Sequence, residues 1–390
     1  RQETFKVAGG EEHHLEVRST HHGPILSDLE PDFGDIAADP PAEWYESDVE
    51  VPAGEWALSL RWTALDVTTT AQAIFTLNRV RNFADFRQAA SEFDVPGQNL
   101  MYADMQGNIG YQAPGKLPIR GAGDGYLPQP GWDSAYDWQG FIPHEELPVI
   151  YNPDSGYIVT ANHAIVTDDY PYLLSRDWDY GHRAARIVER LETLIDAGPL
   201  TVETMATLQM DNQFPAAQLL QEAYADIEVE EADVQAALDL LADWDGHNDA
   251  DSSGAAFANA LWNHLTKAMM NTHQGSIPRD NQSRLVEFFA NQLENPDSPW
   301  WGGDQPALLK TAAKEAYAEL VEEQGTDRQR WNWGELHALP LTHETFGTSG
   351  IAPIEALFNR GPYPTGGGSG VVNATGWDLD QSYATESVPS

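Results

Sequence analysis

The sequence has no cysteine, little lysine and no long apolar run, and each absence excludes a class of protein or of site. Without cysteine, the 390 residues form no disulfide and offer no thiolate as nucleophile or zinc ligand. No stretch approaches the roughly 18 consecutive apolar residues that a membrane-spanning helix requires. The first residues, RQETFKVAGGEEHH, contain no Met and lack the apolar segment of a signal peptide, so we expect the chain to start within a longer gene product or after processing.

Positive charge is scarce as well. Five Lys and sixteen Arg stand against 61 Asp and Glu, which gives a formal net charge of -40. A surface of this sign repels the phosphates of nucleic acids and the headgroups of anionic membranes, which argues against nucleic-acid binding. Because the acidic residues are spread over the whole chain, the composition favours a halophilic protein, in which molar salt shortens the Debye length to about 3 Å or less and screens the self-repulsion. An ordinary acidic protein is the alternative.

Extended segments flank a long helical block. Residues 1–65 are rich in β-prone residues, and 99–111 carry the pattern of a hairpin with Gly107 in its turn. We expect the strands of 1–65, 99–111 and 156–162 to share one sheet system. From 181 to about 321 apolar residues recur at helical spacing. After a first helix that closes at Gly198, this pattern predicts further helices near 201–211, 214–227, 230–243, 254–272, 282–294 and 305–323.

The sequence contains two groups of potential metal ligands, but the residues around each argue against a metal site. His21 and His22 suggest a metal site or a base, but neighbouring residues in a strand point to opposite faces and would not enter one site. The Asp-rich run 243–254 is superficially similar to a calcium loop, yet no Glu stands at the twelfth position from any of its Asp residues. We interpret that run as a capped turn between two helices.

The hairpin and the loop after it also offer candidates. Asp104 is expected to accept hydrogen bonds from the amides of the hairpin turn, with a catalytic role as the alternative. The run 115–143 is too rich in Gly, Pro and aromatic residues for regular elements. Its Trp132, Tyr136 and Trp138 either line an apolar pocket or simply pack over the core.

The segment from Tyr151 to Arg183 delivers polar side chains just before the helical block. Its NPDSG run at 152–156 predicts a tight turn, and the following Tyr-Ile-Val-Thr at 157–160 predicts a short strand. The strand ends at Asn162, whose amide can both donate and accept hydrogen bonds. The local pattern alone leaves two roles open for Asn162, a loop or cap residue and a functional one.

Two motifs in the chain are specific: YADMQGNIGY at 102–111, and NPDSGYI at 152–158 followed by Asn162, Tyr170-Pro171 and Arg183. They resemble the β-chain motifs of the penicillin acylase (penicillin amidase) family of N-terminal nucleophile hydrolases. Weaker similarities lie at 18–26, 358–362 and 371–374, so the resemblance covers nearly the whole chain.

The resemblance implies an α+β fold, the αββα sandwich of N-terminal nucleophile hydrolases with a large helical insertion. It implies one acylase β-chain body over 1–390, truncated at both ends. That body has a sheet-rich part with the aromatic loop at 1–180, a helical insertion at 181–325 and a return to the sheet region at 326–390.

The resemblance also assigns catalytic roles to two residues. In the family the Asn that matches Asn162 lends its amide to the oxyanion hole, and the Arg that matches Arg183 supports the site. The family nucleophile is a Ser that begins the β-chain and uses its own α-amine as base. Because Arg1 occupies this position here, we expect the nucleophile and the other oxyanion donor to lie upstream.

We therefore expect an amide hydrolase that cleaves the side-chain amide of penicillin-like or other N-acyl substrates, although this chain alone should be inactive. The alternatives are an acyl-homoserine lactone or cephalosporin acylase of the same family, and a secreted binding protein that keeps the fold without catalysis. The resemblance implies as partners a small-molecule N-acyl substrate, the protein's own α-chain and the upstream β-chain segment. It implies no cofactor for the chemistry and allows a structural calcium, for which no residue is assigned. We expect an extracellular or cell-envelope location, with the cytoplasm as the alternative.

Overall fold

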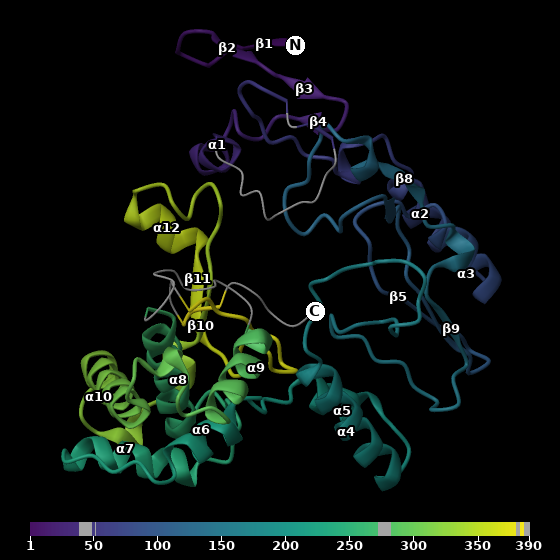
Figure 1. Cartoon of the computed structure of the whole chain (residues 1–390). Helices are drawn as coiled ribbons and strands as arrows, with labels where there is room; N and C mark the ends of the chain where they lie inside the picture. Colours follow the sequence, from purple (N-terminus) through teal and green to yellow (C-terminus); the bar gives the residue numbers. More distant parts are fainter. Residues whose placement is uncertain (39–48, 51, 272–281, 380–382, 386–390) are drawn as a thin grey trace. The chain divides into compact units, whose positions relative to one another are not determined.

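The computed structural model describes residues 1–38, 49–50, 52–271, 282–379 and 383–385 (Figure 1). The chain forms two compact units: Arg1–Thr160 with Ile165–Trp178, and Ala161–Ala164 with Asp179–Ser390. None of the described helices is long and apolar enough to cross a membrane. The three-part division at 180 and 325 stays a prediction.

The first unit is built from short antiparallel strands. Strand β1 (Gln2–Phe5) pairs with β2 (His13–Glu16), β3 (Ser19–Thr20) with β4 (Gly23–Pro24), and β7 (Pro118–Arg120) with β8 (Trp138–Phe141). The largest sheet has the order β5 (Leu100–Ala103), β6 (Ile109–Gln112), β9 (Val149–Tyr151). Helices α1 (Pro31–Ala38), α2 (Thr70–Leu77) and α3 (Phe83–Ala90) complete the unit, together with the 3-10 turns Thr63–Leu65, Ser134–Tyr136 and His144–Glu146.

Two strand predictions are wrong for the part of the chain that the structure describes. The strands of 1–65 and 99–111 lie in separate small sheets rather than in one. Residues 157–160, which the sequence predicts to be a short strand, pair with no other strand among the described residues. Side-chain propensity selects an extended backbone, whereas a strand also needs a neighbour for its N–H and C=O groups, and that neighbour is not encoded locally.

The hairpin of β5 and β6 turns as predicted. Asp104 accepts hydrogen bonds from the backbone N–H of Gln106 at 2.9 Å and of Asn108 at 3.0 Å. The side-chain amide of Asn108 donates to Asp104 as well, and with the other hydrogen bonds it outweighs desolvation and lowers the pKa of Asp104 to about 2. Gly110 is required by packing, since a Cβ there would lie 2.3 Å from the Phe83 ring. All four partners of the Asp104 carboxylate belong to the hairpin itself, so its role is structural.

The second unit is a helical body. Its helices are α4 (His182–Ala197), α5 (Val202–Gln209), α6 (Ala217–Tyr224), α7 (Ala232–Asp243), α8 (Ser253–Asn271), α9 (Gln282–Leu293), α10 (Gln305–Gln324), α11 (Trp333–Leu336) and α12 (Ala352–Phe358). The 3-10 turns Pro299–Trp301 and Arg328–Arg330 and the antiparallel strands β10 (Ala338–Leu341) and β11 (Arg360–Pro364) complete it. The helical spacing of the sequence predicted α5 to α10 to within a few residues.

Helix α8 is the centre of this unit and contacts α10, α7 and α6 (Figure 1). It is apolar or small on nearly every face, as a helix surrounded by others must be, and Phe257, Leu261, Trp262 and Leu265 are fully buried. The Asp-rich run at 243–254 connects α7 to α8 as an ordinary turn: the backbone N–H of His247 donates to Asp245. The predicted interhelical turn is therefore confirmed.

Candidate active site

The loop Ala161–Ala164 belongs to the second unit, where it is tied to the chain just before α4. Asn162 has a φ of 65°, a left-handed conformation that Asn tolerates better than most residues. Its carbonyl oxygen accepts a hydrogen bond of 3.0 Å from the backbone N–H of Asp179. An isolated parallel bridge pairs His163 with Asp179. The turn at Asn162 is thus held from the backbone side, and its side chain is exposed.

Arg183 lies in the first turn of α4. The helix begins after Gly181, whose φ of 91° suits glycine and whose N–H donates to the Asp179 carboxylate at 2.8 Å. A cation at a helix N-terminus is disfavoured by the helix dipole. The Asp179 carboxylate, 3.9 Å from the Arg183 guanidinium, offsets this repulsion.

Asn162 and Arg183, 21 residues apart in the sequence, are in direct contact. The Nη2 atom of Arg183 donates to Oδ1 of Asn162 at 2.6 Å and to the carbonyl oxygen of Ala161 at 3.1 Å. Because a guanidinium can only donate, it fixes which end of the Asn162 amide is the oxygen. The Nδ2 group of Asn162 then points away from Arg183 and has no partner among the described residues, so it is available as a donor.

Asp179 completes the arrangement and is the residue that the sequence analysis missed. Its backbone N–H orients the Asn162 loop, one carboxylate oxygen holds the start of α4, and the other faces Arg183. The sequence did contain a signal for this role. Asp179 stands two residues before Gly181, where the helical pattern begins, and an Asp at this spacing often accepts a hydrogen bond from the backbone N–H two residues later.

The aromatic residues of 115–143 line a cavity of about 1010 Å³ in the first unit. Trp132, Tyr136 and Trp138 contribute to its wall together with Trp56, whose ring packs edge-on against Trp132 with the centroids 4.6 Å apart. His21 and His22 line the same cavity and lie close together, in a turn rather than in a strand. The prediction that the two imidazoles diverge is therefore wrong.

Comparison with known proteins shows where this α+β chain belongs. It is a member of the penicillin amidase family, whose profile matches residues 1–390. The acyl-homoserine lactone acylase QuiP of Pseudomonas aeruginosa is 26% identical to it, over 100% of this chain and 49% of that protein. The penicillin acylase 2 proenzyme of a Pseudomonas species is 27% identical, over 96% of this chain and 46% of that protein. The chain thus spans about half the length of these curated relatives.

The solved structures give the fold. A thermostable penicillin G acylase from Alcaligenes faecalis matches with a TM-score of 0.60 and 22% identity, over 85% of this chain and 62% of that one. The α+β fold of N-terminal nucleophile hydrolases, predicted from the sequence, is confirmed by this match.

Proposed function

We propose that the chain forms part of an amide-hydrolysing acylase, in which the side chain of Asn162 donates to the tetrahedral oxyanion and Arg183 positions it. The observation that carries the proposal is the 2.6 Å hydrogen bond from Arg183 to Oδ1 of Asn162. This bond occupies the acceptor end of the amide and turns the donor end outward. A neutral donor held in advance stabilises negative charge that appears only in the transition state, which is the requirement for raising kcat.

The nucleophile in this proposal is an N-terminal Ser outside residues 1–390. Its α-amine accepts the hydroxyl proton, the oxygen attacks the amide carbonyl, and the proton passes to the leaving amine as the acyl-enzyme forms. Water then attacks the ester carbonyl of the acyl-enzyme, the α-amine takes up its proton and passes it to the Ser oxygen, and the acid is released. The oxyanion forms in both steps, so Asn162 would act twice. The partners of the chain are accordingly the segment that carries the Ser, an α-chain and an N-acyl substrate.

The substrate is an N-acyl compound, either a penicillin-like side-chain amide or an acyl-homoserine lactone. The penicillin acylase 2 relative supports the first candidate, and the QuiP relative, matched over 100% of this chain and 49% of its own length, supports the second. Phenylacetyl, aliphatic and homoserine-lactone amides therefore form the substrate panel.

The experiment is steady-state kinetics of the complete, processed enzyme with three substitutions at one position. Asn162→Ala removes the amide but strains the left-handed backbone, whereas Asn162→Gly removes the amide without strain because glycine adopts a φ of 65° freely. Asn162→Asp keeps the acceptor for Arg183 and replaces the donor by a negative charge. We expect kcat to fall by about 10² to 10³ in the Gly and Ala variants, and further in the Asp variant.

The matched control is His163→Ala, the adjacent residue in the same loop, which should retain most of kcat. Circular dichroism of each variant confirms the fold. Near-normal kcat in Asn162→Gly, or an equal loss of kcat in His163→Ala, would show that Asn162 is not an oxyanion donor. If the complete protein binds N-acyl compounds but hydrolyses none of them, the chain belongs to a binding protein instead.

A further inference from the structure

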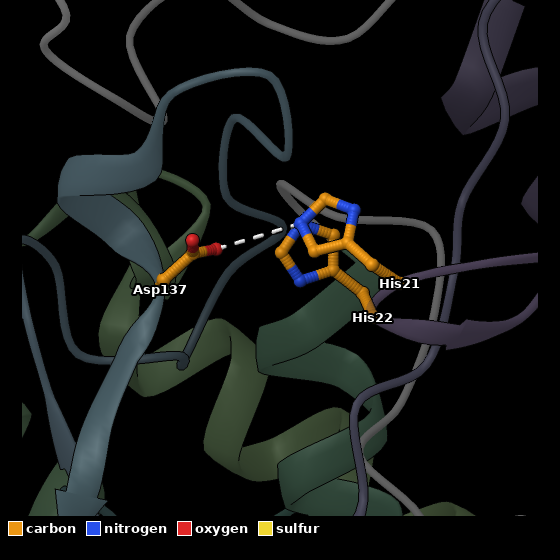
Figure 2. A group of neighbouring side chains, drawn as sticks. All are labelled: His21, His22 and Asp137. Carbon is orange, nitrogen blue, oxygen red and sulfur yellow. Dashed lines mark ion pairs between the residues drawn. The ribbon is translucent and has the colours of Figure 1, made fainter.

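His21 and His22 form the two-residue turn between β3 and β4 (Figure 2). The hairpin is fixed by Gly23, where φ is 131° and a Cβ would lie 2.1 Å from the carbonyl oxygen of Leu60. In the turn the two side chains do not alternate between faces, and their ring centroids are 3.7 Å apart. Both imidazoles are therefore presented to the same neighbour.

That neighbour is Asp137, which follows the 3-10 turn Ser134–Tyr136 and precedes β8. Its Oδ1 atom lies 3.7 Å from Nε2 of His21 and 3.7 Å from Nε2 of His22. Figure 2 shows the carboxylate facing the two rings. Two imidazole nitrogens and one carboxylate oxygen, from segments more than 100 residues apart in sequence, thus lie within 4.8 Å of one another.

We propose that His21, His22 and Asp137 bind a divalent transition-metal ion of the zinc class. Zinc binds imidazole nitrogen and carboxylate oxygen at about 2.0–2.2 Å, so tetrahedral ligand atoms are separated by about 3.3–3.6 Å. The two nitrogen–oxygen distances of 3.7 Å require only a slight contraction, and the two imidazole nitrogens lie within 4.8 Å of each other. Imidazole donors favour zinc, copper or nickel over magnesium and calcium, which prefer oxygen alone. Three protein ligands leave a fourth position for water or a small molecule.

A hydrogen bond and a close backbone contact hold the ring of His22 in place. Its Nε2 atom is 3.1 Å from the carbonyl oxygen of Gly131, and because a carbonyl only accepts, this nitrogen donates its proton in the metal-free protein. For Nε2 to bind a metal, the ring must adopt the other tautomer, in which the proton is on Nδ1 and the lone pair is on Nε2. Gly131 also lies against the ring, where a Cβ would be 3.3 Å from Nε2, so the loop holds His22 in place.

The three ligands line the cavity that contains Trp56, Trp132 and Trp138. The fourth coordination position of the ion therefore has room beside an apolar wall. A site of this form suits water, or the donor atom of a small apolar molecule such as a fatty or aromatic carboxylate. This arrangement lies within the first unit and is independent of the proposed role of Asn162.

The test is calorimetric titration of the full chain with Zn²⁺ in the presence of excess Mg²⁺. The magnesium occupies sites made of carboxylates alone, which a protein with a net charge of -40 offers in number, and it competes poorly for imidazole. We expect one zinc per chain to remain bound under these conditions. Co²⁺ in place of Zn²⁺ should give the visible absorption of a tetrahedral site.

Three variants and a control decide the assignment. His21→Ala removes an exposed ligand, His22→Gln keeps a donor for Gly131, and Asp137→Asn keeps the shape of the carboxylate. Each should weaken zinc binding at least about tenfold, since even changes outside the ligand shell cost that much. The control is His14→Ala, in another exposed His pair of the same unit. Unchanged binding in the His21→Ala/His22→Gln double variant, or an equal loss in His14→Ala, would overturn the proposal.

Discussion

The guanidinium of Arg183 donates to Oδ1 of Asn162 at 2.6 Å, and the same Nη2 atom donates to the carbonyl oxygen of Ala161 at 3.1 Å. One nitrogen therefore fixes both the side chain and the backbone of the Asn162 loop. An Asn with one end held this way loses its freedom to flip, and its Nδ2 group keeps a constant direction. In the proposed function Arg183 would act on the chemistry only through Asn162, as a positioning residue.

Replacing Arg183 should therefore lower kcat and leave KM nearly unchanged. Arg183→Met keeps an unbranched, flexible stem but removes the guanidinium and its donors, so the amide of Asn162 is free to rotate away from the oxyanion. We expect a loss in kcat of about tenfold to a hundredfold, which corresponds to about 1.4–2.7 kcal/mol. Kinetics of the complete enzyme on a chromogenic amide measure the effect.

The double variant Arg183→Met/Asn162→Gly distinguishes positioning from a general structural role. If Arg183 acts through Asn162, the double variant should be no slower than Asn162→Gly alone, because the amide that Arg183 orients is absent. Additive losses would show that Arg183 contributes to the site by another route. The melting temperature of each variant provides the folding control.

A second prediction concerns the ion pair between Arg186 of α4 and Asp211. Nε and Nη2 of Arg186 donate to the two carboxylate oxygens at 3.0 and 2.8 Å, and the Asp211 side chain is only 6% exposed. Asp211→Ala removes this partner and leaves Arg186 with Glu189, 3.0 Å away, which should lower the free energy of unfolding by about 1.5–3 kcal/mol. Urea denaturation at constant salt measures this change.

The control for this prediction is Glu231→Ala, which breaks the exposed pair with Lys314 at 2.8 Å in the same unit. Exposed pairs contribute about 0–1 kcal/mol. The pH dependence gives a second check. Desolvation would raise the pKa of Asp211, but the hydrogen bond from Arg186 and the other favourable contacts outweigh it and lower the pKa. The stability from this pair is therefore present above the unfolded pKa of Asp and lost as the pH falls through the lower folded pKa. Equal effects of the two substitutions would contradict the interpretation of Asp211 as a buried partner.

Local patterns in the sequence predicted the helices and much of the candidate site, because both depend on short-range chemistry. The apolar spacing of most helices from α4 to α10 follows from the burial of one face, whereas α8 is buried on nearly every side. Asn162 and Arg183 were placed by motifs, and the structure brings them into contact. Non-local pairings were not predictable in the same way. Local patterns in the sequence do not show that 157–160 lacks a neighbouring strand among the described residues, nor that His21 falls in a turn opposite Asp137.

A third prediction concerns salt. The chain carries 61 acidic and 21 basic residues, so most of its carboxylates lack a cationic partner and repel one another. Molar KCl should raise the melting temperature, because a Debye length of about 3 Å screens this repulsion in the folded state. Melting temperatures measured in KCl and in sucrose of equal osmolality distinguish charge screening from the stabilisation that any solute excluded from the protein surface produces. A melting temperature that is the same at about 0.1 M and in molar KCl would argue against a halophilic protein.

The last prediction concerns pH and the buried His337, which has no exposed surface. Its Nδ1 donates to the carbonyl oxygen of Tyr383 at 2.6 Å, and its ring stacks on Trp333 with the centroids 4.6 Å apart. Burial lowers the pKa of His337 to about 4, against about 6.5 in an unfolded chain. Between these values the unfolded state binds more protons, so stability rises with pH across this window and is lost as the pH falls.

The full effect of this shift is about 3 kcal/mol, at about 1.4 kcal/mol for each unit of pKa. His337→Gln keeps a donor for Tyr383 and cannot titrate in this range. The variant should therefore lose less stability than the wild type between pH 7 and pH 4.5, measured by urea unfolding at fixed ionic strength. His14→Gln, at an exposed position, should follow the wild type. If His337→Gln shows the same pH dependence as the wild type, protonation of His337 does not govern acid unfolding, and the carboxylates alone must account for it.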